Sequence, residues 1–220
     1  MNRGLILTVV LLAACYLTPE SGIAQSTYHL QRASLFEALA GDSTDIIFLG
    51  NSITDGGNWA ELFGDLRVKN RGISADISSG VLDRLDVILK NKPAKIFLMI
   101  GVNDLARGIE VPAITANYEE IISRVKTESP QSRLYLQSVL PVNPELNMFP
   151  DHTNKSREIS QLNWQLRRLA KLNGLTYVDL WSEFVDTAGI LDTAYTNDGL
   201  HLTGQGYILW RDLVKELVFE

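Results

Sequence analysis

The feature that most constrains the fold of this chain is an alternation of short apolar runs with amphipathic segments. Five runs rich in apolar residues cover residues 45–49, 66–70, 95–100, 134–139 and 176–180. Continuous apolar runs of this length are typical of strands covered on both faces, as in a parallel sheet. Between them, apolar residues recur at helical spacing, which marks the buried faces of helices. The pattern predicts an α/β fold, a three-layer α/β/α sandwich around a five-stranded parallel sheet with right-handed crossovers.

Residues 1–24 have the pattern of an export signal. A positively charged start is followed by an almost wholly apolar segment over residues 4–17, which is too short to span a bilayer as a helix. Small residues before Gln25 fit ordinary cleavage there, whereas Leu12–Cys15 resembles a bacterial lipobox, with lipidation of Cys15 and an anchor in the cell envelope. Cys15 also fits as a plain apolar residue of the signal core. We expect an exported protein that is periplasmic, extracellular or lipid-anchored.

Length, charge and cysteine content narrow the possible domain organisation, partners and metal sites further. The 220 residues are 45% hydrophobic, which suits one domain with a sizeable core over residues 25–220. A net charge of −6 without a basic run argues against a nucleic-acid partner. Cys15 is the single cysteine, so neither an intramolecular disulfide nor a cysteine-rich zinc site is expected. The oligomeric state is left open.

Polar residues follow the predicted strands, where an open parallel sheet binds its ligands. Ser52 comes after the first run, Gly72 after the second and Asn103 after the third. Each has an ordinary interpretation when taken alone. A serine commonly caps a helix, a glycine commonly makes a turn, and an asparagine commonly forms an Asx-turn.

Near the C-terminus, Asp198 and His201 are three residues apart around a glycine. A serine hydroxyl is a poor nucleophile until a base takes its proton, and a carboxylate on the other ring nitrogen holds a histidine in the required tautomer. Of the other two histidines, His29 is expected at the surface, and so is His152, although His152 lies in a proline-rich loop and could border a pocket.

Four segments in this order resemble the SGNH hydrolase superfamily, also called GDSL esterases and lipases: Gly50–Thr54, Gly72, Gly101–Asp104 and Asp198–His201. The resemblance covers about residues 45–215 and implies a flavodoxin-like fold. It also implies Ser52 as the nucleophile, His201 as the general base and Asp198 as the residue that orients His201. The oxyanion hole would comprise the N–H groups of Ser52 and Gly72 and the side-chain amide of Asn103. Asn51 departs from the aspartate of the family's name-giving motif.

The resemblance implies a serine esterase that needs no metal or cofactor. We expect a secreted enzyme that hydrolyses short acyl esters, with acetylated carbohydrate or a similar small ester as its substrate. Asn51, Trp59, Tyr195 and the 140–154 loop are candidates for the substrate pocket. A lysophospholipase or thioesterase activity is the alternative within the family. Two other classes stay open: a non-catalytic surface binding protein, and a metal-dependent phosphoesterase using Asn51, Asp55, Asn103, Asp198 and His201.

Overall fold

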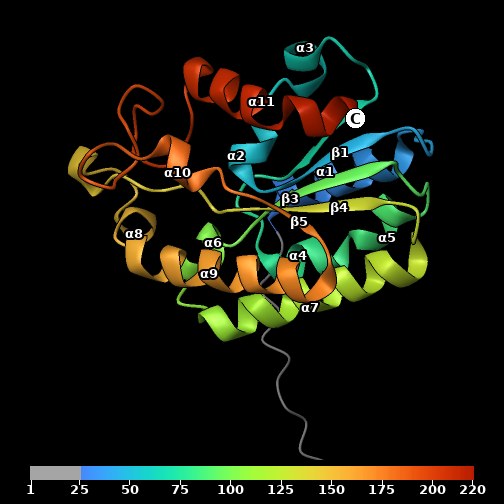
Figure 1. The fold of residues 1–220 in the computed structure, drawn as a ribbon, viewed down its shortest axis with the longest axis horizontal. Helices are drawn as coiled ribbons and strands as arrows, with labels where there is room; N and C mark the ends of the chain where they lie inside the picture. The colour runs from blue at the N-terminus through green and yellow to red at the C-terminus, as the bar shows by residue number, and fades with distance from the viewer. Residues whose placement is uncertain (1–25) are drawn as a thin grey trace, which may run out of the picture.

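A computed structural model describes residues 26–220 (Figure 1). The predicted export signal, its cleavage before Gln25 and the lipidation of Cys15 fall outside the described residues. Within residues 26–220, no helix combines the length and the apolar character needed to cross a membrane.

The described chain is built on a parallel sheet of five strands in the order β2-β1-β3-β4-β5. This confirms the predicted α/β fold and its parallel sheet. The second strand begins later than predicted because Leu66 is exposed, whereas Val68 is buried. The strands are β1 (Ile46–Gly50), β2 (Val68–Gly72), β3 (Lys95–Met99), β4 (Arg133–Gln137) and β5 (Thr176–Val178).

Helices cover both faces of the sheet, which gives the predicted three layers (Figure 1). One face carries α2 (Ser52–Asp55), α3 (Trp59–Phe63) and α11 (Gly204–Phe219). The other carries α4 (Ser78–Asp83), α5 (Leu85–Leu89), α7 (Val111–Glu128) and α9 (Ser156–Asn173). The remaining elements are α1 (Thr27–Ala38), α6 (Val102–Ala106), the 3₁₀ turn η1 (Pro144–Leu146), α8 (Pro150–Thr153) and α10 (Trp181–Phe184).

The helical pattern around residues 81–89 is divided into two short helices, α4 and α5, at Arg84. The Arg84 guanidinium is buried and donates to the Asp76 carboxylate at 2.9 Å and to the Gly50 carbonyl at 3.1 Å. A buried charge needs such partners. Burial lowers the pKa of Arg84, and the neighbouring Asp76 opposes that shift. The backbone at Arg84 departs from helical geometry (φ −109°, ψ 10°), so the helix is interrupted at this residue.

A row of aromatic rings forms the core between the sheet and α11. Phe48, Phe97 and Tyr135 are register partners on neighbouring strands, and their rings stack with centroids 4.9 Å and 4.4 Å apart. Trp59 stacks on Phe48 at 4.0 Å, and Trp210 of α11 meets Trp59 edge-on at 4.8 Å. Aromatic pairs in these arrangements add to the stabilisation from burial alone. The row therefore supports β1 rigidly, and β1 is the strand that leads to Ser52.

The strand order places two of the candidate segments side by side. From β1 the chain crosses to β2 on one side, and after β3 it continues to β4 on the other side. Open α/β sheets bind ligands where the strand order reverses in this way. In this sheet the reversal lies at the carboxyl ends of β1 and β3. Ser52 follows β1 and Asn103 follows β3. The topology thus brings a hydroxyl and an amide to the same edge of the sheet.

Candidate active site

Ser52 is the first residue of α2, directly after the turn at the end of β1. Asn51 is the N-cap, and its Oδ1 accepts a hydrogen bond from the N–H of Ile53 at 3.0 Å. Gly50 allows the chain to pass close to β3, since a Cβ at this position would lie 2.3 Å from the Met99 carbonyl oxygen. The local sequence therefore holds the Ser52 side chain at the carboxyl edge of the sheet, where it is partly exposed.

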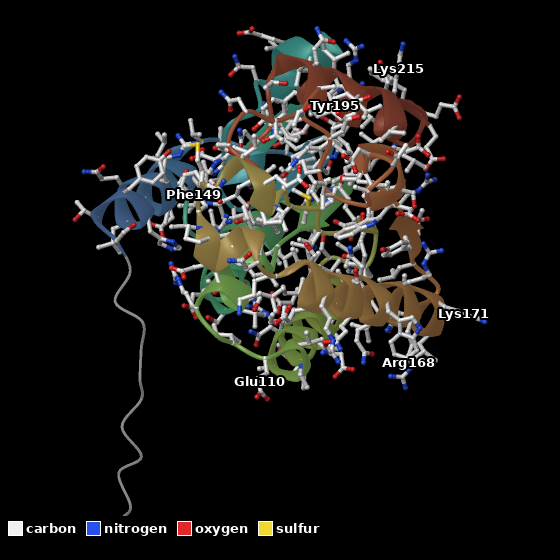
Figure 2. The ribbon with its side chains drawn as sticks, turned by 90° about the vertical axis from the view of Figure 1, so that its left-hand side faces the viewer. Glu110, Phe149, Arg168, Lys171, Tyr195 and Lys215 are labelled. Carbon is white, nitrogen blue, oxygen red and sulfur yellow. The ribbon has the colours of Figure 1, made fainter. Side chains whose placement is uncertain are left out.

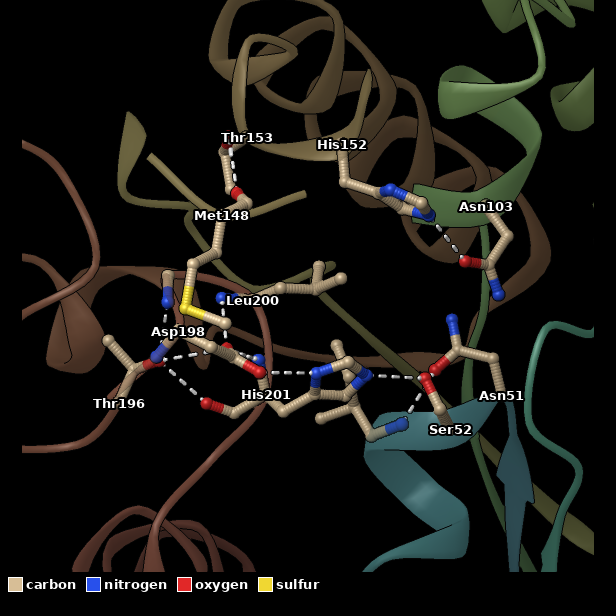
Figure 3. Close-up of polar contacts among 12 residues, drawn as sticks. Asn51, Ser52, Asn103, Met148, His152, Thr153, Thr196, Asp198, Leu200 and His201 are labelled. Carbon is tan, nitrogen blue, oxygen red and sulfur yellow. Dashed lines mark hydrogen bonds and ion pairs between the residues drawn. The ribbon is translucent and has the colours of Figure 1, made fainter. Parts of the chain in front are cut away.

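Ser52, His201 and Asp198 form one hydrogen-bonded line (Figure 3). Ser52 Oγ lies 3.1 Å from His201 Nε2, although the two residues are 149 positions apart. His201 Nδ1 lies 2.8 Å from Asp198 Oδ2. These distances allow proton transfer between the hydroxyl and the ring, with the carboxylate holding the far nitrogen.

Asp198 carries an ionised carboxylate, which is stabilised by hydrogen bonds from the turn that follows it. Burial alone would raise the pKa of this carboxyl, but the N–H groups of His201 and Leu200 donate to it at 2.7 Å and 2.9 Å. Together with the His201 ring they hold the pKa of Asp198 below its usual range. Gly199 completes the turn with φ +83°, a conformation that side chains rarely adopt. A carboxylate is thus available to the histidine across the neutral pH range.

Asn103 lies at the start of α6 and is 6% exposed. Its Nδ2 donates to the Asp76 carbonyl at 2.8 Å, and its Oδ1 lies 3.0 Å from His152 Nε2. One N–H of the amide group is thereby used, and the second is left for another acceptor. In Figure 3 the Asn103 side chain lies across the site from His201, on the side of Asn51 and Ser52.

The expected role of Gly72 as an oxyanion donor does not agree with the structure. The single N–H of Gly72 donates to Asn70 Oδ1 at 2.8 Å. The glycine has a packing reason instead, because a Cβ here would lie 2.2 Å from the backbone nitrogen of Asp55. Asn70 also donates to the carbonyls of Thr54, Asp55 and Gly57 at 2.9–3.1 Å. Gly72 and Asn70 together fasten β2 to α2.

Ala75, in the loop after β2, has a conformation that the sequence does not indicate. Its φ is +64°, in the left-handed region that an alanine rarely adopts. Arg107 donates to its carbonyl at 2.7 Å, and the next carbonyl, that of Asp76, accepts from Asn103. Ala75 is an exposed residue, and within residues 26–220 no hydrogen bond is found from its N–H. A backbone donor beside Asn103 is therefore provided by a residue without any motif signal.

Three residues were expected in the substrate pocket, and the structure shows what each of them contacts. Asn51 is a buried helix cap, as described above. Trp59 is 1% exposed, and its Nε1 donates to the Thr54 carbonyl at 2.8 Å, so it belongs to the aromatic core. Tyr195 packs edge-on against Phe184 at 5.4 Å. In Figure 2 it lies beside α11, away from Phe149. For Trp59 the expectation was wrong, because aromatic residues are equally suited to a core and to a pocket.

The 140–154 loop, which was expected to line the pocket, brings an aromatic residue that was not singled out against the candidate triad. Phe149 meets the His201 ring edge-on at 5.3 Å and the His152 ring at 6.2 Å. Phe149 and Met148 are 41% and 47% exposed, which leaves apolar surface beside the candidate triad. The only sequence signal for this wall is the length and proline content of the 140–154 loop.

The residues of the alternative phosphoesterase site do not gather as metal ligands. The Asp55 carboxylate accepts hydrogen bonds from Tyr28 at 2.7 Å, from Ser74 at 3.2 Å and from Arg32 at 3.3 Å. The Asp198 carboxylate instead accepts from the His201 ring. In the described part of the chain, no three or more His, Cys, Asp or Glu side chains lie close enough together to hold a metal ion.

Comparisons with known proteins give one family match and several similar proteins and structures. The GDSL-like lipase/acylhydrolase family matches residues 48–209. Subunit alpha2 of platelet-activating factor acetylhydrolase IB from Rattus norvegicus is 28% identical over 182 residues, which cover 80% of this chain and 76% of that protein. The structure of a GDSL-like lipase from Bacteroides thetaiotaomicron has a TM-score of 0.76 at 26% identity, covering 87% of this chain and 97% of the other. An acetylxylan esterase from Geobacillus stearothermophilus shares the fold at 17% identity (TM-score 0.66, covering 81% and 95%).

Proposed function

The chain belongs to the GDSL-like lipase/acylhydrolase family, and from this premise we propose that it is a serine esterase that cleaves short-chain carboxylic esters through an acyl-enzyme. The observation that carries the proposal is the line from Ser52 Oγ to His201 Nε2 (3.1 Å) and from His201 Nδ1 to Asp198 (2.8 Å). In this mechanism Ser52 is the nucleophile, His201 is the general base and later the general acid, and Asp198 orients the ring.

The reaction has two half-reactions. As Ser52 Oγ attacks the acyl carbon, its proton passes to His201 Nε2 and the carbonyl π electrons move to the oxygen. The tetrahedral intermediate collapses, the C–O bond to the alcohol breaks, and His201 protonates the departing oxygen. Water then loses a proton to His201 and attacks the acyl-enzyme. The acid is released, and the proton returns to Ser52.

The oxyanion requires hydrogen-bond donors that are free before the reaction begins. The N–H of Ser52 and the second N–H of Asn103 Nδ2 are our first two donors. For the third we propose the N–H of Ala75 in place of that of Gly72. Two observations support this choice: the N–H of Gly72 already has a partner in Asn70, and Ala75 follows in the loop that carries the Asp76–Asn103 bond.

The test of the proposed function is labelling by a fluorophosphonate, followed by mass mapping of the modified peptide. We expect the label on Ser52. We also expect Ser52→Ala to lose the label and to lower turnover of p-nitrophenyl acetate by about 10⁴-fold or more, because members of a triad act as one unit. Retention of near-full activity by Ser52→Ala would refute the assignment. Absence of label on an active wild-type enzyme would do the same.

For the substrate we propose an acetyl ester. The described chain has little beyond its sheet, its helices and the 143–154 segment, so a large lid over a long acyl chain is not available. Two further observations are relevant: a curated relative is named an acetylhydrolase, and the exposed Phe149 and Met148 offer an apolar contact beside His201. Acetylated carbohydrate is our first candidate, and a lysophospholipid or thioester is the alternative.

A series of p-nitrophenyl esters tests the acyl length, and a panel of acetylated xylooligosaccharides, lysophospholipids and acyl thioesters tests the leaving group. We expect kcat/KM to fall from the C2 ester to the C8 ester. Faster turnover of C8 than of C2 would contradict the short-acyl proposal without affecting the role of Ser52.

We also propose that the enzyme is exported, from the pattern of residues 1–24. Intact-mass measurement of the protein recovered from a bacterial host distinguishes cleavage before Gln25 from lipidation of Cys15. An uncleaved N-terminus in the cytoplasmic fraction would contradict export.

A further inference from the structure

His152 makes a directed contact with the candidate oxyanion hole from outside the four motif segments. It lies on α8, and its Nε2 is 3.0 Å from Asn103 Oδ1 (Figure 3). The other end of the same amide group donates to the Asp76 carbonyl at 2.8 Å. The two contacts differ in kind, since the Asp76 carbonyl can only accept a hydrogen bond, whereas a ring N–H can donate one.

The contact with Asp76 defines which end of the amide group faces which neighbour. With the amide reversed, Oδ1 would face the Asp76 carbonyl, acceptor against acceptor, so the Asp76 contact fixes the orientation of the amide group. Oδ1 then faces His152 Nε2, which can complete the contact only by donating. In the observed orientation both contacts are satisfied, and the second N–H of Nδ2 is directed by the plane of the amide group.

We propose that His152 is a positioning residue for the reaction: its Nε2–H holds Asn103 Oδ1 and so aims the second N–H of Asn103 at the developing oxyanion. The proposal rests on the proposed esterase function. His152 acts through Asn103 and is not itself in contact with the reacting atoms. A hydrogen bond to Oδ1 also polarises the amide group, which makes its N–H a stronger donor.

The loop around His152 is held in place, so the contact does not depend on a free side chain. Thr153 is buried, and its Oγ1 donates to the carbonyls of Met148 and Phe149, each at 3.2 Å. At the other end of the segment, Asn143 donates to Leu191 at 2.8 Å through its side chain and to Gly199 at 2.9 Å through its backbone. The segment that carries His152 is thus attached to the turn that carries Asp198 and His201.

The proposal requires opposite tautomers for the two histidines of the site. His201 accepts at Nε2 from Ser52 and donates from Nδ1 to Asp198. His152 must donate from Nε2, because Asn103 Oδ1 can only accept. Burial lowers the pKa of the His152 ring, which favours the neutral form at pH 7. A neutral His152 with its proton on Nε2 is the state that the geometry needs.

A matched pair of substitutions tests this role. A glutamine places its amide nitrogen near the position of Nε2, whereas an asparagine is one methylene shorter and does not reach Asn103. We expect His152→Asn and His152→Ala to lower kcat for p-nitrophenyl acetate by about 10- to 100-fold, below the 10²–10³-fold typical of removing a donor outright. We expect KM to be nearly unchanged and His152→Gln to retain most of kcat.

A double-mutant cycle with Asn103→Ala separates positioning from other roles. If His152 acts through Asn103, then His152→Ala has little further effect on kcat once Asn103 has been replaced. Additive losses in kcat would overturn the proposal, because they would place His152 in a separate contact. A rise in KM at constant kcat, or equal activities of the glutamine and asparagine variants, would also overturn it.

Two controls distinguish loss of the positioning role of His152 from misfolding of the variants and from failure of the proposed function. Thermal unfolding midpoints of the three His152 variants should match that of the wild type. The ¹⁵N shifts of the His152 ring, identified by their loss in His152→Gln, should show the proton on Nε2, and a proton on Nδ1 would overturn the proposal without any assay. A wild-type protein that neither hydrolyses esters nor takes the fluorophosphonate label would instead refute the proposed function.

Discussion

Two walls of the candidate site are built in contrasting ways. The nucleophile wall, residues 50–57, is fixed by its surroundings on nearly every side. Tyr207 and Trp59 donate to the carbonyls of Ile53 and Thr54 at 2.8 Å. Asn70 donates to that of Thr54 as well, and to those of Asp55 and Gly57. The loop wall, residues 143–154, bonds largely to itself, and two of its residues, Asn147 and Phe149, have positive φ.

The difference indicates that the two walls have different functions. In the proposed mechanism Ser52 has to meet the acyl carbon at a defined position, and the aromatic core below β1 supports the strand that leads to Ser52. The loop wall contributes an exposed apolar surface and one polar contact, His152 to Asn103. Segments with few buried contacts can vary in sequence at little cost in stability, and they commonly carry specificity. We therefore expect the loop wall to determine the substrate.

The largest expected effect concerns Asp198, in the turn that joins the two walls. Asp198→Asn should lower kcat by about 10⁴-fold with little change in the fold, because an amide no longer holds His201 in the tautomer that accepts from Ser52. Steady-state kinetics on p-nitrophenyl acetate measure this. Asp192→Asn, a change in the same loop at a carboxylate that accepts from the N–H of Ala194, should leave kcat unchanged. A loss below tenfold for Asp198→Asn would contradict the orienting role.

The next effect tests the contrast between the walls directly. Trp59→Ala should lower the free energy of unfolding by about 3–5 kcal/mol, because it leaves a large cavity against Phe48 and Trp210. Phe149→Ala should lower it by less than about 1 kcal/mol, because the side chain is 41% exposed. We expect Phe149→Ala instead to raise KM for the preferred ester. Urea titration measures the stabilities, and equal losses for the two variants would break the comparison.

A third prediction concerns Asp104, the neighbour of Asn103. Burial raises the pKa of this carboxyl to about 6, although hydrogen bonds from Ser78 oppose the shift. Between pH 4 and 6 the folded chain therefore binds more protons than the unfolded chain, so stability falls as the pH rises through this window. The shift of about 2 pH units corresponds to about 3 kcal/mol.

Asp104→Asn removes this titration. The free energy of unfolding of the wild type, relative to that of the variant, should fall by about 3 kcal/mol from pH 4 to pH 7, as measured by urea titration at each pH. Asp83→Asn, at an exposed carboxylate, should show no such trend. A difference that rises with pH would reverse the sign and contradict the assignment.

The smallest expected effect is at Ala75, in the loop after β2, and it is compared with a change at Gly72, the last residue of β2. Ala75→Gly should stabilise the fold by up to about 1 kcal/mol, because glycine adopts φ +64° without strain. Gly72→Ala should destabilise it, because the added Cβ would lie 2.2 Å from the Asp55 nitrogen. Thermal unfolding distinguishes the two, and destabilisation by both changes would contradict the strain assigned to Ala75.

Much of the architecture could be predicted because it depends on local patterns. The apolar runs become strands covered on both faces, and the spacing of Ile159, Leu162 and Leu166 gives α9 its buried face. The boundary between α4 and α5 could not be predicted in this way. It depends on the buried Arg84, whose partners Asp76 and Gly50 come from other parts of the chain.

The candidate site shows the same difference between what local sequence patterns predict and what contacts between distant residues decide. The amino-acid sequence by itself determined the order of the strands and helices along the chain. It also determined the presence of a serine after β1, an asparagine after β3, and an aspartate and a histidine between β5 and α11. Only the tertiary structure decided that Trp59 is core, that Asn70 bonds to the carbonyls of the segment after β1, and that His152 reaches Asn103. The physical reason is that burial and hydrogen bonding depend on partners brought together by folding, whereas strand and helix periodicity is contained in each segment.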